Sequence, residues 1–203
     1  ANIGAYSTAL GYGTIARGLA GTALGLRTIA AGVYSTALGY QTNATGQAAT
    51  ALGYSTNATG ANSIAMGIQS TASGINATAM GSLTVASGTG ATATGFQSVA
   101  SGDYSTATGY QSTASGVSST AMGVVTSAAA IGSTAMGNLA TVVGAADGSF
   151  VYGDRSTAGP GNTTARITAY APNQFLVRAA GGVGFYTNAA LTAGVTLASG
   201  EAA

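Results

Sequence analysis

The sequence contains no Cys, His, Lys or Trp, and only 4% of its 203 residues are charged. Without His or Cys, neither a Ser-His-Asp nor a Cys-His arrangement for nucleophilic catalysis can form within the chain. A calcium-binding β-roll needs an Asp in every turn, whereas the acidic residues here are Asp103, Asp147, Asp154 and Glu201. We therefore expect no metal, no cofactor and no enzymatic activity.

The scarcity of charge also limits the possible partners. The net charge is +1, and the region up to residue 146 carries only Arg17, Arg27 and Asp103, so no basic patch for nucleic acid exists there. No apolar run approaches the roughly 18 residues of a membrane span, which argues against direct membrane insertion of this segment. With 46% apolar residues the chain is expected to be ordered. It starts in the middle of a heptad, as a piece of a longer protein would.

The most regular feature of the sequence is a glycine at every seventh residue. The series runs from Gly4 to Gly123 and resumes at Gly137 and Gly144 after one failure at Ala130. Alanine stands two positions before each glycine from Ala9 to Ala135. Such a strict period indicates one structural unit stacked on copies of itself.

The heptad predicts strands and excludes a coiled coil. A glycine in every heptad would cost a helix about 1 kcal/mol each, and a coiled coil needs large residues at its core positions. Thr, Val, Ile and Tyr at alternating positions favour strands of about five residues. The residues at −4, −2 and 0 relative to glycine share one face, which reads Ser/Thr-Ala-Gly and suits a tight interior. We expect the glycines to serve unusual backbone angles at the bends and close backbone approach.

The opposite face shows that the true repeat has fourteen residues and two strands. The residue before glycine is Leu, Met or Thr in every second heptad, from Leu10 to Met136, and small or polar in most of the others. The residue after the same glycine adds further apolar side chains. A ladder of this kind is a large exposed apolar patch on a single chain, and such patches mark interfaces. A thin roll also buries little apolar surface alone, so the sequence predicts an obligate oligomer.

Heptads such as Asn62–Gly67 and Gln97–Gly102 resemble the head repeats of trimeric autotransporter adhesins of the YadA type. The resemblance covers about residues 1–146. It implies an all-β fold, a left-handed parallel β-roll, with three copies about a threefold axis and the Leu/Met strand facing that axis. The predicted trimer interface contains Leu10, Leu24, Leu38, Leu52, Met66, Met80, Met122, Met136, Tyr12, Tyr40, Tyr54, Phe96 and Tyr110.

After Gly144 the seven-residue rhythm ends. Residues 147–172 are rich in turn residues and are expected to form a transition loop. Residues 171–188 resemble the short β-element that precedes an intramolecular chaperone of the S74 (endosialidase) class in bacterial and phage fibres. Within 173–203 we expect a small hairpin of residues 175–178 and 183–186 turning at Gly181 and Gly182. The chaperone and the membrane translocator are absent from this sequence, which raises a phage or injection-system tail fibre as the parent assembly.

The sequence thus favours an extracellular fibre segment, a homotrimer that mediates attachment to a cell-surface receptor, matrix protein or glycan. A purely structural shaft is the first alternative. A second alternative is a glycan hydrolase that uses Asp147 and Asp154, but the usual role of Asp in turns explains these residues more simply. A third is an ice-binding protein, but packing between stacked threonines explains the threonine pattern more simply. The ice-binding alternative uses a column of threonines, Thr8, Thr22, Thr36, Thr50, Thr78, Thr92, Thr106, Thr120 and Thr134. Tyr6, Tyr34 and Tyr104, two residues after a glycine, are candidate sugar contacts or loop anchors.

Overall fold

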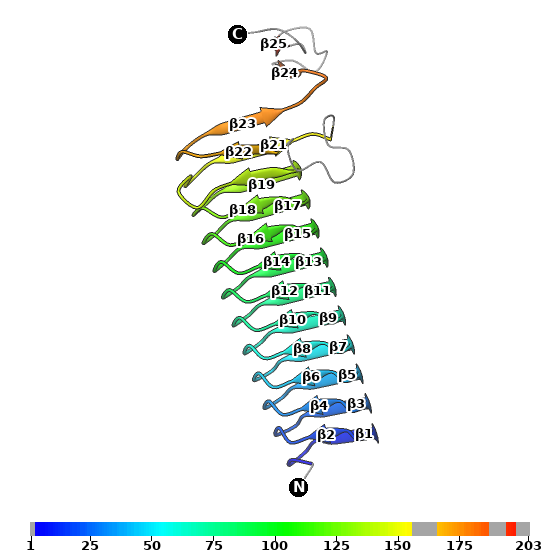
Figure 1. Ribbon diagram of the computed structural model, residues 1–203. Coiled ribbons are helices and arrows are strands. Elements are labelled where there is room, and N and C mark those ends of the chain that lie inside the picture. The colour runs from blue at the N-terminus through cyan, green and yellow to red at the C-terminus, as the bar shows by residue number, and fades with distance from the viewer. Residues whose placement is uncertain (1–2, 156–165, 187–193, 198–203) are drawn as a thin grey trace.

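Each fourteen-residue repeat forms one turn of a parallel β-roll that contains one long and one short strand (Figure 1). The computed structural model describes residues 3–155, 166–186 and 194–197. The described residues contain strands, turns and bends and no helix. The long strands stack into a twelve-stranded sheet and the short strands into an eleven-stranded sheet. The predicted all-β parallel roll with two strands per fourteen residues is confirmed.

The long strands have five residues each in the regular part of the roll. They are β1 Thr8–Tyr12, β3 Thr22–Leu26, β5 Thr36–Tyr40, β7 Thr50–Tyr54, β9 Ile64–Ile68, β11 Thr78–Ser82, β13 Thr92–Phe96, β15 Thr106–Tyr110, β17 Thr120–Val124 and β19 Thr134–Asn138. The short strands are β2 Ile15–Ala16, β4 Ile29–Ala30, β6 Asn43–Ala44, β8 Asn57–Ala58, β10 Thr71–Ala72, β12 Val85–Ala86, β14 Val99–Ala100, β16 Thr113–Ala114, β18 Ser127–Ala128 and β20 Ala140–Val142.

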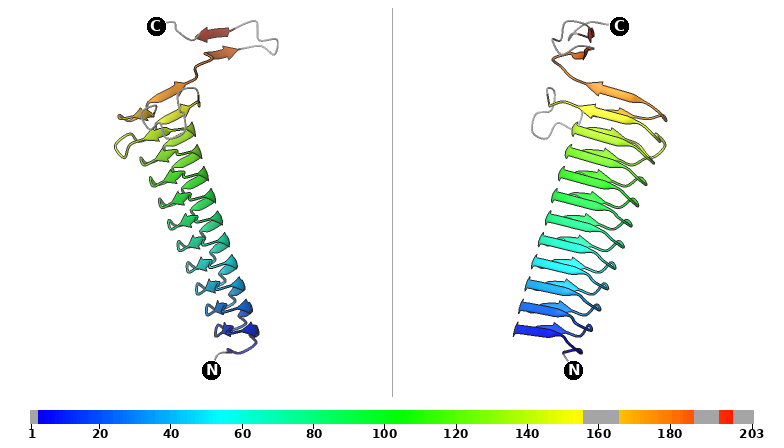
Figure 2. Two further views of the ribbon diagram at one scale, coloured as in Figure 1. Left: turned by 45° about the vertical axis from the view of Figure 1, so that its right-hand side comes forward. Right: turned by 180° about the vertical axis from the view of Figure 1, so that it is seen from behind.

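The register places each residue of a long strand beside its equivalent in the next turn. Thr36 pairs with Thr50, and Leu38 pairs with Leu52. The strands of the two sheets therefore form a regular stack (Figure 2). The register places like residues above one another along it. At about 4.8 Å between strands, the stack extends for roughly 50 Å.

The core between the two sheets consists almost wholly of small side chains. In the turn that contains β5 and β6, Ser35, Ala37, Thr42 and Ala44 are all fully buried. In almost all of the remaining turns the same positions are also Ser, Thr, Gly or Ala, so the two sheets can approach closely. The predicted inward positions −4 and −2 are buried, whereas position 0 is buried after the short strands, as at Gly32, and only half-buried in the long strands, as at Gly39.

Close approach explains why glycine recurs. A β-carbon added to Gly53 would overlap the carbonyl oxygen of Gly67 in the next turn, and one added to Gly46 would overlap that of Gly60. Gly53 also has a φ of 125°, which L side chains rarely adopt, and it lies within β7 rather than at a bend. Gly46 has no such φ, so close packing alone accounts for it.

The repeat glycines are expected to adopt the left-handed conformation at the bends, but in most bends a non-glycine residue adopts it. The residue two positions after each repeat glycine from Gly4 to Gly137 has a positive φ, as in Gln41 and Ala48, both at 52°, and after Gly11 and Gly88 this residue is itself a glycine. Left-handed geometry costs a non-glycine residue about 1–2 kcal/mol. From Ala20 onward, a hydrogen bond to the preceding turn offsets this cost at these bends: Gln41 N donates to Leu26 O at 2.8 Å, and Ala48 N donates to Val33 O at 2.7 Å.

The single alanine in the glycine series, Ala130, lies where the regular stack ends. The next long strand, β21 (Phe150–Gly153), follows β19 by sixteen residues instead of fourteen, as the pairing of Thr134 with Phe150 shows. The bend that precedes β21 therefore contains two extra residues. The buried methyl group of Ala130 is accommodated beside this irregular turn.

The two sheets continue beyond residue 146 through three further strands. β21 and β23 (Phe175–Arg178) extend the long-strand sheet, and β22 (Ile167–Ala169) extends the short-strand sheet. The expected hairpin of residues 175–178 with 183–186 is therefore wrong. β23 pairs in parallel with β21, whereas β24 (Val183–Tyr186) pairs antiparallel with β25 (Gly194–Leu197). Alternation alone could not reveal these partners, because it describes the faces of a strand and not its neighbours.

Candidate interface on the outer face of the long-strand sheet

The long strands turn alternate side chains away from the core, and these side chains form what we call the outer face. Along β5 the outward residues are Thr36, Leu38 and Tyr40, while Ala37 is buried. Register stacks each of them on its equivalent in the next turn. The outer face therefore consists of three parallel columns: a threonine column, a central column and a trailing edge.

The central column contains the residues before the long-strand glycines. They are Leu10, Leu24, Leu38, Leu52, Met66, Met80, Thr94, Thr108, Met122 and Met136. All of these side chains are partly or largely exposed in the isolated chain. Two consecutive threonines interrupt the apolar run, and Thr94 Oγ1 donates to Thr108 Oγ1 at 3.2 Å.

The trailing edge contains the residues after the same glycines, where the chain bends toward the short strand. They are Tyr12, Leu26, Tyr40, Tyr54, Ile68, Ser82, Phe96, Tyr110, Val124 and Asn138. Aromatic neighbours stack on one another, with ring centroids 4.9 Å apart for Tyr40 and Tyr54 and 5.3 Å apart for Phe96 and Tyr110. Every predicted interface residue thus lies on the central column or the trailing edge of one face.

The bends that precede the long strands form a second edge, which we call the leading edge. Its residues follow the short-strand glycines, or Ala130 in the last turn, and are Ala5, Leu19, Val33, Gln47, Ala61, Ile75, Thr89, Asp103, Val117 and Ile131. Five of them are exposed large hydrophobic residues, among them Ile75 and Ile131. The sequence interpretation missed this edge, although the signal was present one residue after every second glycine.

Tyr6, Tyr34 and Tyr104 directly follow leading-edge residues and occupy the left-handed position of the bend, with φ between 57° and 60°. All three are exposed, and Tyr6 is 92% exposed. The ring of Tyr104 covers Gly90 in the preceding turn, where an added β-carbon would lie 3.0 Å from Tyr104 Cδ1. This packing gives Tyr104 a structural role at the bend beside its exposed hydroxyl end.

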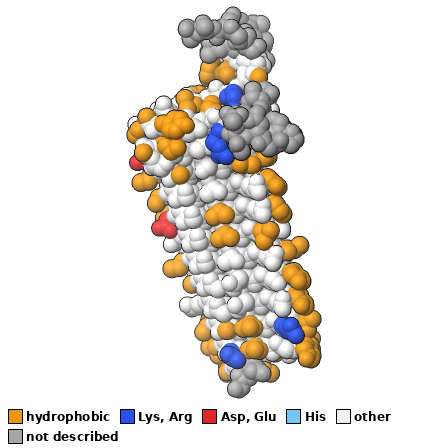
Figure 3. Space-filling view, in the orientation of Figure 1, with side chains coloured by type: hydrophobic (Ala, Val, Ile, Leu, Met, Phe, Trp, Pro, Cys, Tyr) orange, Lys and Arg blue, Asp and Glu red, His pale blue; other side chains and the backbone are white. Residues whose placement is uncertain are grey.

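The outward face of the short-strand sheet is mostly polar. It presents Asn43, Thr45, Asn57 and Thr59 in two turns, followed by Thr, Val and Ser in later ones. Figure 3 shows this difference: hydrophobic side chains gather along both edges of the roll, and the face between them is largely polar. Within the described residues, no helix is long and apolar enough to cross a membrane.

The carboxylates belong to bends and to the last turns of the roll. Asp103 Oδ1 accepts a hydrogen bond from Thr89 N at 2.8 Å, and Asp147 Oδ1 accepts one from Ile131 N at 2.9 Å. Asp147 precedes β21 and Asp154 follows it, so the strand separates them by roughly 13 Å. A glycosidase pair needs about 5–9.5 Å. Among the described residues, no three His, Cys, Asp or Glu side chains gather as a metal site.

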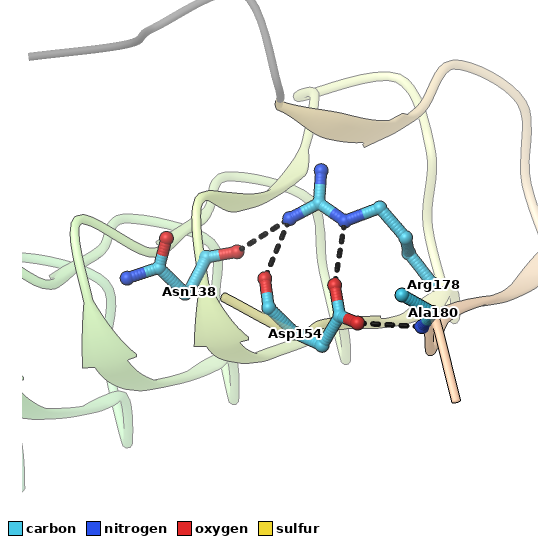
Figure 4. A network of polar contacts seen from close by, with 4 residues as sticks. All are labelled: Asn138, Asp154, Arg178 and Ala180. Atoms are coloured by element: carbon cyan, nitrogen blue, oxygen red, sulfur yellow. Dashed lines mark hydrogen bonds and ion pairs between the residues drawn. The ribbon is translucent and has the colours of Figure 1, made fainter. Parts of the chain in front are cut away.

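Asp154 and Arg178 join the ends of β21 and β23 (Figure 4). Arg178 Nε donates to Asp154 Oδ1 at 3.1 Å, and an Nη of Arg178 donates to the backbone oxygen of Asp154 at 2.8 Å. The second carboxylate oxygen of Asp154 accepts from Ala180 N at 2.6 Å. These contacts tie the ends of β21 and β23 together, which is typical of a cap on the stack.

Comparison with known families agrees with this architecture. The family model described as "YadA head domain repeat (2 copies)" matches residues 3–28, 30–56, 58–84, 86–112 and 114–140, about two thirds of the chain. Each match spans close to two turns of the roll. The matched ranges end before β21, so the resemblance of residues 171–188 to a pre-chaperone element is a sequence inference alone. No curated protein matches the chain.

Proposed function

Because the chain belongs to the family of YadA head domain repeats, we propose that three copies of it pack side by side, with their outer faces toward a common axis, as a stiff attachment segment of a surface fibre. Repeats of this family form the heads of trimeric, surface-exposed adhesins, so the chain is a segment of an adhesin-type fibre. The arrangement of the three copies and the attachment to a receptor are the parts that we propose.

The uncovered outer face carries the proposal. Leu24, Leu38 and Met80 are each between 37% and 40% exposed in the single chain, and their neighbours in the same column are also accessible. An apolar surface of this extent along the roll, interrupted in the central column only at Thr94 and Thr108, is typical of an interface. The core of Ala, Ser and Thr supplies little apolar area, so burial of this face adds stability that the single chain lacks.

The remaining surfaces suit contact with a host. If the outer faces meet at the axis, the polar short-strand faces point away from it. Hydroxyl and amide side chains there, such as Thr45, Thr59 and Asn57, can hydrogen bond to a glycan or to a protein backbone. The exposed rings of Tyr6 and Tyr34 lie at the border of that face and can stack on sugars.

The molecular mass in solution tests the assembly. A single chain has a mass of 19.2 kDa, and three copies would have about 58 kDa, three times that value. Light scattering coupled to size exclusion should give the larger value at micromolar concentration. A folded monomer under these conditions would overturn the proposal.

Attachment is tested separately, with the trimer applied to arrays of glycans and matrix proteins. We expect retention on some array members without release of any cleaved product. Replacement of Tyr34 by Ala should reduce retention if the ring stacks on a sugar, whereas replacement of Tyr54, which belongs to the trailing edge, should not act through ligand contact. Absence of retention on every array member would favour a purely structural shaft.

A further inference from the structure

In seven of the ten regular turns, the leading and trailing edges carry complementary side chains. In two of these turns the leading edge has the large residue, Ile75 or Ile131, and the trailing edge has Ser82 or Asn138. Where the leading edge has a small or polar residue, the trailing edge has a large one. These turns pair Ala5 with Tyr12, Gln47 with Tyr54, Ala61 with Ile68, Thr89 with Phe96 and Asp103 with Tyr110.

The remaining three turns have apolar residues at both edges, as in Leu19 with Leu26 and Val117 with Val124. Every turn therefore has at least one large or apolar residue among its two edge positions, and seven turns have it at one edge only. A relationship of this kind between two positions indicates that the two side chains share one space.

The two edges cannot meet within one chain. Ile75 precedes β11 and Ser82 ends it, so the five-residue strand Thr78–Ser82 lies between them. At about 3.3 Å per residue they are more than roughly 15 Å apart, whereas side chains in contact approach within about 4.5 Å. Both side chains are also accessible in the single chain, with Ile75 53% exposed. The space that they share must lie between copies.

We infer that the leading edge of one copy packs against the trailing edge of the next copy, at the same height along the fibre. This inference rests on the proposed threefold assembly. A threefold axis along the roll brings different patches of neighbouring copies together, and such head-to-tail contacts close into a ring. It also places equivalent turns at the same height, which is the arrangement in which Ile75 faces Ser82 of the next copy.

The edge contact would also set the register of the three chains. The central column changes residue type at only three places along the roll, so it distinguishes an aligned trimer only weakly from one slipped by fourteen residues. A slip by one turn in one direction would bring Ile75 against Phe96 and Ala61 against Ser82. A slip in the other direction would bring Ile75 against Ile68 and Thr89 against Ser82. Either slip places two large side chains in one contact and two small ones in another. The overfilled contact and the void would each destabilise the trimer.

A double-mutant cycle on Ile75 and Ser82 tests the contact. Ile75→Ser leaves a void and Ser82→Ile overfills the same space, so each change alone should lower the melting temperature of the trimer. The double variant I75S/S82I restores one large and one small residue and should regain most of the loss. The matched control I131S/S82I makes the same chemical changes four turns apart, and its two effects should add.

Circular dichroism should show unchanged β-content in all of these variants, since both side chains point out of the roll. Additive effects in I75S/S82I, equal to those in I131S/S82I, would overturn the inference. A monomeric starting protein would instead refute the proposed assembly, so the two failures are distinguishable. Nitroxide labels at Ser101→Cys provide a second readout, because the chain has no cysteine of its own. An aligned trimer should give one label-to-label distance, and slipped chains would add longer ones and contradict the inferred register.

Discussion

Arg178 Nε lies 3.1 Å from Oδ1 of Asp154, and the ion pair connects the last two strands of the long-strand sheet. Arg178 occupies the position of the sheet that glycine holds in earlier turns, because it pairs with Gly153. Among the described strands, β23 is the last of the twelve-stranded sheet and none stacks on it, so a long side chain is tolerated there. The pair thus closes the roll at the point where close backbone packing ends.

Loss of this ion pair should loosen the last turns and leave the others intact. Arg178→Met removes hydrogen bonds to Asp154 and leaves a half-buried carboxylate, which we expect to cost about 1–3 kcal/mol locally. In a stacked roll each turn contacts only its neighbours, so the effect should not reach β1 to β15. Hydrogen exchange should show faster exchange in β21 and β23 alone. Uniform loss of protection along the whole roll would contradict this view.

Gly53 should be irreplaceable, because an added β-carbon would overlap the carbonyl oxygen of Gly67. With the strain of its φ of 125°, Gly53→Ala should cost on the order of 4 kcal/mol. Gly132→Ala is the matched control: Gly132 has a φ of 61° and no atom within 4 Å of an added β-carbon. It should cost only about 1–2 kcal/mol. Urea unfolding of both variants measures the difference, and equal losses would show that packing between turns is not the cause.

Side chains of the central column should be required for the proposed trimer to form. Replacement of Leu38 and Leu52 by Asp would place charges in the proposed interface, at a cost of several kcal/mol, and should yield monomers or unfolded chains. Replacement of Thr45 and Thr59 by Asp introduces the same charges in the same turns on the short-strand face, and should leave the trimer intact. Sedimentation measures both. A trimer that survives the Leu changes would refute the proposed orientation.

The two threonines in the central column should weaken the interface where they lie. Thr94 and Thr108 stand between Met80 and Met122 in the column, and each polar hydroxyl replaces apolar surface there. The variant T94M/T108M should raise the stability of the trimer by about 1–2 kcal/mol for each substituted position in each chain. Ser87→Met, on the short-strand face, should have little effect. Thermal unfolding distinguishes the two, and a lower melting temperature in T94M/T108M would show that the threonines are required.

The sequence alone determined the unit of the fold and the direction of its side chains. A strand turns successive residues to opposite faces, so the order Ser35-Thr36-Ala37-Leu38 is sufficient to place Ser and Ala inward and Thr and Leu outward. The fourteen-residue period followed from comparison of alternate heptads. These properties are local, and they repeat often enough for the pattern to be unmistakable.

Three features could be decided only by the tertiary structure, because each depends on contacts between residues far apart in the chain. The pairing of Phe175–Arg178 with β21, rather than with β24, depends on which strand edge is available after residue 155. The left-handed bends at residues such as Gln41 and Ala48 are sustained by hydrogen bonds to the previous turn. The complementarity of Ile75 and Ser82 depends on the strand between them, which places the two residues at opposite edges of the outer face and too far apart to touch within one chain. The periodicity of the sequence determines the face on which a side chain lies, and the stacking of the turns determines which residues it contacts.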